Sequence, residues 1–233
     1  MISRVAVFGG TSYLASLLKS QKSVNNIKYI FFSRKKKVRN YIYSLQLKKN
    51  HRIINKFDFI IHLVGPNQNQ LKKNKNLIKK KNIITSKICD LCLTHNIKLI
   101  YVSSMQIYKN YGKSNLSIKS KINQKNSYSR AHYESEKIIK KKFLNNKNMF
   151  TILRMGNVFG FKKFRNVREI NNNLVNNLCY AAIKKGEILI KDSTIQRTFV
   201  PSNQFIQMLN FIIKKNIIKN SIINVFYKNL NLY

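Results

Sequence analysis

The feature of this sequence that most constrains its fold is a short apolar strand that runs into a glycine turn and then into a helix. The strand is Val5-Ala6-Val7-Phe8, the turn is Gly9-Gly10-Thr11-Ser12, and residues 13–19 have a helical pattern. This order is typical of the phosphate-binding start of a βαβ unit, where N–H groups at the helix start face a pyrophosphate. The sequence therefore predicts a phosphate-binding turn near the N-terminus.

The glycines of this turn depart from the usual spacing. A pattern with glycine at every third position would use positions 9, 12 and 15, and the chain has Gly9, Ser12 and Ala15 there. Small side chains still allow a close approach to a dinucleotide. The alternative is a strand–helix turn that binds no ligand. The cofactor contacts that we expect from this turn are Gly9, Thr11, Ser12, Tyr13 and Leu14.

Apolar strands and helical segments alternate along the rest of the chain. Strands are predicted at residues 28–32, 57–64, 97–103, 150–155, 188–190 and 222–226. Helices are predicted at residues 71–94, 133–143 and 174–184. This alternation indicates an α/β fold of Rossmann type, a doubly wound and mainly parallel sheet. The chain has only two prolines and no Pro/Gly linker, so residues 1–233 are expected to form a single domain.

The formal net charge of +38 raises the hypothesis of a nucleic-acid partner. However, Lys, Asn and Ile are enriched together, and all three have A/T-rich codons. The basic residues are also spread along the whole chain, whereas phosphate-binding surfaces concentrate them on one face or stripe. We therefore attribute the charge to biased gene composition and expect no nucleic-acid partner. RNA binding stays as an alternative that a salt titration would test.

The acidic residues and cysteines argue against several classes of site. No two of the seven Asp and Glu residues are placed like the carboxylate pair of a glycosidase. Cys89 and Cys92 form a CxxC, but it lies within a helical run and has no second pair. We interpret both as core residues at helical spacing rather than as zinc or redox ligands, and expect no metal site.

The same sequence argues against a membrane protein. No apolar run approaches the ~20 residues that cross a bilayer. The first predicted strand follows the N-terminus directly, without the pattern of a signal peptide. We expect a cytoplasmic protein with no membrane association.

Several segments spread along nearly the whole chain carry a family resemblance. They are VAVFGGTSYLA near residue 10, FDFIIHLVGPN ending at Asn67, IKLIYVSSMQIY ending at Tyr108, YSRAHYESEKII from Tyr128, ILRMGNVFG from Ile152 and QRTFV from Gln196. In this order they resemble the extended short-chain dehydrogenase/reductase family, which contains the NAD-dependent sugar-nucleotide epimerases and dehydratases. The resemblance implies that residues 1–233 bind NAD(P) and act on a nucleoside-diphosphate sugar.

The resemblance implies a catalytic group of Ser104, Tyr128 and His132. Hydride transfer at a hydroxyl-bearing carbon also requires a proton to move, and a phenol whose pKa is lowered from about 10 can move it at neutral pH. Tyr128 would be this acid/base, and Ser104 would orient the substrate oxygen. Relatives carry a lysine four residues after the tyrosine, where it holds the nicotinamide ribose and lowers the tyrosine pKa. Here that position is His132, which can hydrogen-bond the ribose.

A second pair with the same spacing is Tyr133 and Lys137. We prefer Tyr128, because Glu136 then falls where the helix of the family has its acidic residue. The alternative pair is interpreted as a helical i, i+4 neighbour pair in a lysine-rich chain.

The resemblance also places cofactor contacts after the second predicted strand and after the strand at residues 57–64. In the latter turn, Leu63, Val64 and Gly65 would line the cofactor. At the end of the former strand, Ser33-Arg34 replaces the acidic residue that usually holds the adenosine ribose. An arginine there suits a 2′-phosphate, so we expect an NAD(P) cofactor with a preference for NADP(H).

On the substrate side, the resemblance implies contacts to the nucleoside diphosphate from Asn157, Asn173, Leu174 and Arg197. Arg197 would meet the diphosphate as a charged hydrogen-bond donor. Residues 157–233 would contribute a small, shortened C-terminal substrate lobe, because relatives continue for several tens of residues. Met105 and Gln106 stand where dehydratases carry Asp-Glu, which argues against 4,6-dehydration and leaves epimerisation or ketone reduction.

The resulting hypothesis is an NAD(P)-dependent sugar-nucleotide epimerase or reductase of surface-polysaccharide biosynthesis. The alternative is a non-catalytic dinucleotide-binding relative with a structural or regulatory role. His132, the replaced glycines and the short C-terminal part favour that alternative. By analogy with relatives we expect a homodimer formed through the helices at residues 71–94 and 133–143, which light scattering would test.

Overall fold

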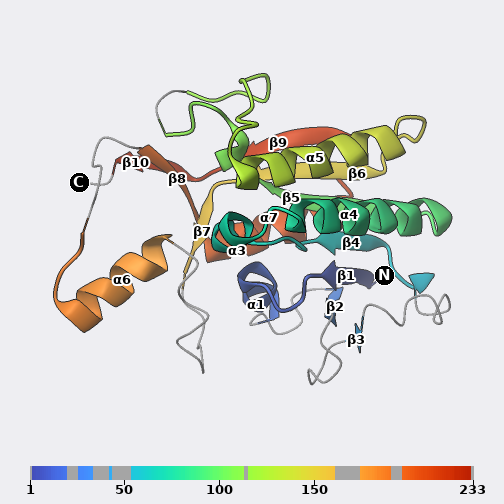
Figure 1. Cartoon of the computed structure of the whole chain (residues 1–233). Coiled ribbons are helices and arrows are strands. Elements are labelled where there is room, and N and C mark those ends of the chain that lie inside the picture. Colours follow the sequence, from blue (N-terminus) through green and yellow to red (C-terminus); the bar gives the residue numbers. More distant parts are fainter. Residues whose placement is uncertain are drawn as a thin grey trace.

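The computed structural model describes residues 2–19, 26–33, 42–43, 54–112, 115–160, 174–189 and 196–231. Its main sheet is built from β1 (Ser3–Phe8), β2 (Ile27–Ser33), β3 (Ile42–Tyr43), β4 (Phe59–His62), β5 (Lys98–Ser104), β6 (Phe150–Met155) and β9 (Ser221–Val225). These strands form a seven-stranded sheet in the order β3-β2-β1-β4-β5-β6-β9 (Figure 1). Every neighbouring pair is parallel, which confirms the predicted α/β sheet.

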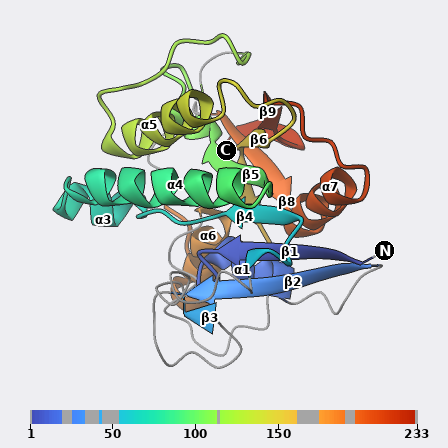
Figure 2. The same ribbon diagram turned by 90° about the vertical axis from the view of Figure 1, so that its right-hand side faces the viewer.

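Helices cover both faces of this sheet (Figure 2). They are α1 (Tyr13–Lys19), α3 (Gln68–Lys73), α4 (Leu77–Thr94), α5 (Ser127–Lys142) and α7 (Ser202–Lys214). On one face, Leu17 of α1 and Leu209 of α7 belong to one buried apolar cluster. On the other face, Cys89 and Cys92 of α4 pack with Ile139 of α5 in a second cluster, as expected for core cysteines. The fold is therefore the doubly wound Rossmann type.

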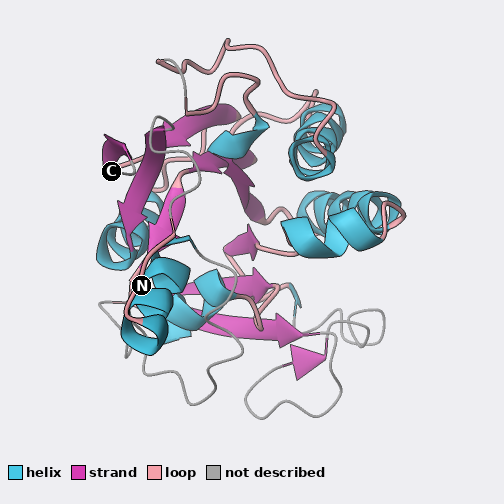
Figure 3. Ribbon diagram, turned by 60° about the vertical axis from the view of Figure 1, so that its left-hand side comes forward, coloured by secondary structure: helices cyan, strands magenta, loops and turns pink. Residues whose placement is uncertain are grey.

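A small second sheet stands beside the main one. It has the order β10-β8-β7 and is built from β7 (Asn157–Phe159), β8 (Gln196–Pro201) and β10 (Lys228–Asn231). β8 pairs antiparallel with β10 and parallel with β7. Helix α6 (Leu174–Lys185) lies on this side of the molecule, away from α4 and α5 (Figure 1). Figure 3 distinguishes by colour the strands of both sheets from the helices around them.

Glycine at position 9 sets the distance between the turn after β1 and the turn after β4. Gly9 has a φ of 88°, a conformation that side chains with a Cβ rarely adopt. A Cβ at this position would lie 2.8 Å from the carbonyl carbon of Leu63. The two turns therefore meet backbone to backbone. Because β1 and β4 flank the point where the strand order reverses, the turns border the crevice where such sheets bind ligands.

Two helix predictions were wrong at their ends, because asparagine caps override the apolar pattern. The segment at residues 71–94 is two helices, α3 and α4, since Asn74 is extended and ends α3. The helix expected at residues 133–143 begins at Ser127, because the Asn126 side chain accepts hydrogen bonds from the N–H groups of Tyr128 and Ser129.

The strand expected at residues 188–190 is not formed at its first two positions. Ile188 and Leu189 are exposed and pair with no strand, and residue 190 lies outside the described residues. Within the described part of the chain, no helix combines the length and the apolar character needed to cross a bilayer.

Replacing Gly9 by alanine should lower the free energy of unfolding by about 3 kcal/mol or more. The substitution adds backbone strain, which costs roughly 1–3 kcal/mol, and a clash with the Leu63 backbone. Urea unfolding measures the difference. Gly186 is the matched control, because its φ is 70° but nothing lies within 4 Å of its Cβ position. Gly186→Ala should cost only about 1 kcal/mol. Equal costs would contradict the close contact of the two turns.

Candidate active site

The predicted site residues gather where the parallel strands of the main sheet end. The turn after β1, the turn after β4 and the end of β5 share this edge of the sheet. Ser104 is the last residue of β5 and is buried. The carboxyl edge of an open parallel sheet is where such folds bind ligands.

The turn after β1 is held by its own backbone and by Ser12. The N–H of Gly10 donates to the carbonyl of Phe32 at 2.9 Å, and the N–H of Ser12 donates to the carbonyl of Gly9 at 2.9 Å. The Ser12 hydroxyl oxygen accepts from the N–H of Ala15 at 3.2 Å, so it caps α1. Thr11 is left exposed at the tip of the turn.

The next two residues of the predicted cofactor turn anchor it to the rest of the molecule. The Tyr13 hydroxyl donates to the carbonyl of Gly160 at 3.0 Å, which ties α1 to the end of β7. The Leu14 side chain packs against the apolar cluster under α1. On the neighbouring strand, Ser33 is buried at the end of β2, and Arg34 lies outside the described residues. The preference for NADP(H) therefore stays a prediction.

The turn after β4 packs against Lys81, a buried lysine of α4. The N–H of Leu63 donates to the carbonyl of Phe8 at 2.9 Å, and the N–H of Val64 donates to Nδ1 of His62 at 3.2 Å. A Cβ at Gly65 would come within 3.1 Å of Cε of Lys81. A larger residue at position 65 would therefore require the Lys81 side chain to shift by a few tenths of an ångström.

Helix α5 brings Tyr128 to Ser104, as the sequence predicts. The Ser104 hydroxyl lies close enough to the Tyr128 hydroxyl to stabilise its phenolate form, which lowers the pKa of Tyr128. The ring of His132, one turn further along α5, lies edge-on to the Tyr128 ring with 4.7 Å between their centres. Ser104, Tyr128 and His132 therefore form one cluster at the edge of the sheet.

The pKa of Tyr128 is raised rather than lowered, which corrects the expectation for this residue. Burial is the main cause, and the Ser104 hydroxyl opposes it. The pKa of His132 lies well below its usual value, because burial and then the charge of Lys81 disfavour its protonation. His132 is therefore neutral at physiological pH, and a neutral ring cannot lower the Tyr128 pKa as a lysine would.

The alternative pair, Tyr133 and Lys137, lies on another part of α5. The ammonium of Lys137 stands 5.3 Å from the centre of the Tyr133 ring, and Lys137 is exposed. The neighbouring Glu136 is fully buried, in keeping with the preference for Tyr128.

A buried ion pair fastens α5 to the sheet. Arg154 of β6 donates from Nη2 to Oε2 of Glu136 at 2.7 Å and from Nε to Oε1 at 3.1 Å. Ser103 of β5 donates to the same Oε1 at 2.7 Å. Arg154 Nη1 also donates to the Tyr108 hydroxyl at 2.7 Å, which in turn donates to Oδ1 of Asn224 at 2.6 Å. This network links α5 to strands β5, β6 and β9.

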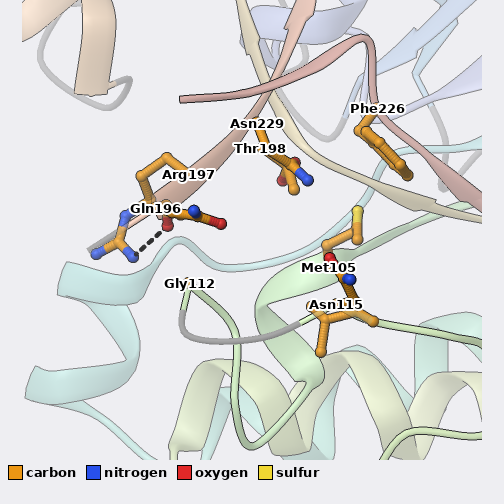
Figure 4. Close-up of a pocket in the computed structure, with 9 residues that line it drawn as sticks. Met105, Gly112, Asn115, Gln196, Arg197, Thr198, Phe226 and Asn229 are labelled. Atoms are coloured by element: carbon orange, nitrogen blue, oxygen red, sulfur yellow. Dashed lines mark hydrogen bonds between the residues drawn. The ribbon is translucent and has the colours of Figure 1, made fainter. Parts of the chain in front are cut away.

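A cavity of about 220 Å³ is lined in part by Met105, the residue after Ser104. Its lining residues are Met105, Gly112, Asn115, Leu116, Gln196, Arg197, Thr198, Phe226 and Asn229 (Figure 4). Arg197 and Gln196 stand at one end and Phe226 at the other. The Arg197 guanidinium also lies over the Tyr111 ring at 5.5 Å. The predicted substrate contact Arg197 thus borders the same pocket as Met105, the residue after Ser104.

The other predicted substrate residues do not line this cavity. Asn157 donates from Nδ2 to the Tyr111 hydroxyl at 2.9 Å and to the carbonyl of Thr198 at 3.2 Å, so it joins β7 to β8. Leu174 is the half-buried first residue of α6. Asn173 lies outside the described residues.

Comparison with models of known families identifies the family of this chain. The family model for the NAD dependent epimerase/dehydratase family matches residues 5–225. The chain belongs to this family. Comparison with curated proteins gave no match.

Solved structures with this fold include members named as epimerases and dehydratases. UDP-N-acetylglucosamine 4-epimerase from Bacillus cereus has a TM-score of 0.74 at 19% identity, over 98% of this chain and 78% of that one. UDP-glucose 4-epimerase from Bifidobacterium longum, in complex with NAD+ and UDP, has a TM-score of 0.79 at 15% identity. The match covers 99% of this chain and 80% of that one. dTDP-glucose 4,6-dehydratase from Bacillus anthracis, in complex with NAD, has a TM-score of 0.76 at 15% identity. The match covers 99% of this chain and 77% of that one.

The residues of this family member fit a dinucleotide. The turns after β1 and β4 meet at the crevice without a side chain between them, because position 9 is glycine. Polar groups of Ser104, Tyr128 and His132 stand at the same edge. Among the described residues, no three His, Cys, Asp or Glu side chains come together to hold a metal ion.

Sequence reasoning missed two buried cations that shape the site, Lys81 and Arg154. Both had a signal. Lys81 falls on the apolar stripe of α4 that includes Ile78 and Ile88, although it stands in a run of lysines. Arg154 interrupts the apolar strand β6, and a charge in a buried strand requires a buried partner.

Glu136→Gln should lower the free energy of unfolding by about 3–5 kcal/mol, because it leaves the Arg154 charge buried without its partner. Urea unfolding measures the change. Glu134→Gln is the control, since its ion pair with Arg130 is partly exposed at 3.8 Å and should contribute less than about 1 kcal/mol. The double change of Glu136 and Arg154 to methionine should cost less than Glu136→Gln alone. Equal effects at positions 134 and 136 would contradict the role of the pair.

Proposed function

We propose that this chain is an NAD(P)-dependent sugar-nucleotide epimerase or reductase that serves surface-polysaccharide biosynthesis in the cytoplasm. The observation that carries the proposal is the cluster of Ser104, Tyr128 and His132 at the edge where Rossmann sheets bind cofactors. Membership of the family and the UDP and NAD in the names of similar structures support it.

The proposed reaction moves one hydride and one proton, and the side chains of the site position the substrate and transfer the proton. The nicotinamide, when bound, accepts or returns a hydride at the sugar carbon. Tyr128 takes the proton from the sugar hydroxyl, or returns it to the ketone, and Ser104 holds that oxygen in place. Arg197 meets the diphosphate of the nucleotide sugar at the far end of the cavity. Asn157, Asn173 and Leu174 complete the substrate side in this proposal.

In this proposal, residues 33–34 determine the choice of cofactor, and Met105 bears on the class of reaction. Ser33-Arg34 favours NADP(H) over NAD(H), and Gly9, Thr11, Ser12, Tyr13 and Leu14, with Leu63, Val64 and Gly65, form the cofactor walls. Met105 is buried beside Ser104 and carries no acid, which favours epimerisation or reduction over dehydration. In this proposal the protein is a homodimer that pairs through α4 and α5, which lie side by side on one face (Figure 2).

A second candidate is a dinucleotide-binding relative without catalysis. The raised pKa of Tyr128 and the neutral state of His132 favour it, because both weaken the acid/base group. This candidate predicts that NADH or NADPH binds and that no nucleotide sugar is converted.

Tyr128→Phe should reduce turnover of UDP-glucose or UDP-N-acetylglucosamine by roughly 10²–10⁴-fold, the usual contribution of a general acid/base. The cofactor dissociation constant should stay within about threefold, since only one hydroxyl is removed. Turnover is followed by product chromatography and binding by the fluorescence of the reduced nicotinamide. Tyr133→Phe is the matched control and should leave both unchanged. Full activity of Tyr128→Phe would overturn the assignment, and a wild-type protein that binds cofactor without turnover would favour the second candidate.

A further inference from the structure

Lys81 is a cation in the interior of the protein, directly under the predicted cofactor turn. Its side chain is 2% exposed, and none of the ion pairs among the described residues includes it. Its ammonium donates to the Tyr101 hydroxyl at 2.9 Å and to the carbonyl of Ala131 at 3.1 Å. Its stem supports Gly65. A buried lysine without an ion-pair partner costs stability, so its position calls for another explanation.

The hydrogen bonds of Lys81 fix the direction of a short relay. An ammonium can only donate, so the Tyr101 oxygen accepts from Lys81 and its own hydrogen points elsewhere. Nδ1 of His132 lies 3.0 Å from the Tyr101 oxygen and is placed to accept that hydrogen. A neutral ring whose Nδ1 accepts carries its hydrogen on Nε2. In this arrangement His132 is a hydrogen-bond donor through Nε2.

A second chain of hydrogen bonds runs beneath the same turn. The N–H of Val64 donates to Nδ1 of His62, so Nε2 of His62 carries the hydrogen and donates to Thr85 at 3.0 Å. Thr85 donates to Ser135 at 3.3 Å, and Ser135 donates to the carbonyl of Ala131 at 3.1 Å. Both chains meet at Ala131, one residue before His132. They join α4, the turn after β4 and the helix that bears Tyr128.

We propose that Lys81 is a positioning residue for the cofactor, which acts through Tyr101 to keep His132 a neutral donor toward the dinucleotide. This inference rests on the proposed function in one respect, that the edge site binds NAD(H) or NADP(H). Lys81 and His132 then divide the role of the lysine that relatives carry four residues after the catalytic tyrosine. His132 supplies the hydrogen bond from α5, and Lys81 supplies the positive charge from α4.

Electrostatics of the surrounding groups agree with this division. Burial lowers the pKa of Lys81 to about 7, while Glu136 and Glu134 oppose the shift. Burial and Lys81 also lower the pKa of His62 to about 3. The titratable groups around Lys81 are His62 on β4, Tyr101 on β5, and Tyr128, His132, Glu134 and Glu136 on α5. Neither histidine is charged at neutral pH, so the charge beneath the turn resides on Lys81, which is protonated in about half of the molecules at pH 7.

Lys81→Met tests the role, because methionine keeps the apolar stem and removes the ammonium. The dissociation constant of NADH at pH 7 should rise about tenfold, equivalent to one hydrogen bond to the cofactor. Lys80→Met is the matched control, since Lys80 is the exposed neighbour on α4, and should change the constant by less than about twofold at moderate salt. The melting temperature of Lys81→Met should stay the same or rise, because a buried charge is lost. Unchanged NADH binding, or weaker binding with a lower melting temperature, would overturn the proposal.

A second experiment moves the lysine from position 81 to position 132. His132→Lys alone should weaken NADH binding, because it places two cations side by side in the interior. Combining it with Lys81→Met should restore the wild-type constant to within about threefold. If the double variant binds no better than the worse single variant, the division of roles is wrong.

The ring of His132 offers a readout that needs neither cofactor nor substrate. Nitrogen resonances of the free protein should show hydrogen on Nε2 and none on Nδ1 between pH 5 and 8. In Lys81→Met the pKa of the ring should rise, because the adjacent charge is gone while burial still lowers it. Hydrogen on Nδ1 in the wild-type protein would overturn the proposal. NADH binding without sugar conversion would overturn only the proposed function, and the Lys81 role would stand.

Discussion

The ion pair between Glu136 and Arg154 is the constraint on which the arrangement of the site depends. Helix α5 carries both Tyr128 and His132, so its position on the sheet decides where these side chains lie. Glu136 is fully buried and receives hydrogen bonds from β5 and β6. Breaking such a pair leaves a buried charge, so α5 has little freedom to slide or rotate. Helix α5 is thereby fixed opposite Ser104 before any ligand binds.

The same carboxylate influences a second part of the interior. Glu136 favours the charged form of Lys81, while burial disfavours it, and the balance leaves a lysine that titrates near neutrality. Between about pH 7 and the usual lysine pKa the unfolded chain binds the additional proton, so this lysine makes the fold more stable as pH rises through that range. Below about pH 7 the cost of its buried charge is present in full. An uncharged residue at position 81 would avoid the cost of this buried charge. We therefore interpret the ammonium as a functional group rather than a stabilising one.

The order of elements and the edge site follow from local patterns that the sequence displays openly. The strand and glycine turn at residues 5–12 predict the start of the βαβ unit, and the apolar runs of β4, β5 and β6 predict the parallel sheet. Helix ends could not be read in the same way. Asn74 and Asn126 are two asparagines among many, and whether such a residue caps or continues a helix depends on its surroundings. For this reason the sequence did not predict that residues 71–94 belong to two helices, α3 and α4.

The pKa of Tyr128 was mispredicted for a different reason. The expectation of a lowered pKa came from the family, in which a lysine follows the tyrosine by four residues. Position 132 is a histidine here, and burial of Tyr128 raises its pKa. Burial of this kind depends on how α5 packs on the sheet, which no local pattern encodes. Arg34 on the cofactor side and Asn173 on the substrate side lie outside the described residues, so the sequence remains the basis for their roles.

The central claim is that the edge of the sheet binds a nicotinamide dinucleotide, and titration of the purified chain with NADH and with NADPH tests it most directly. Fluorescence of the reduced nicotinamide should saturate at low and at moderate salt, with tighter binding of NADPH. A modest weakening with salt is expected from the basic surface. A signal that does not saturate, or that disappears at moderate salt for both dinucleotides, would show only attraction of anions to a basic protein and would contradict the account.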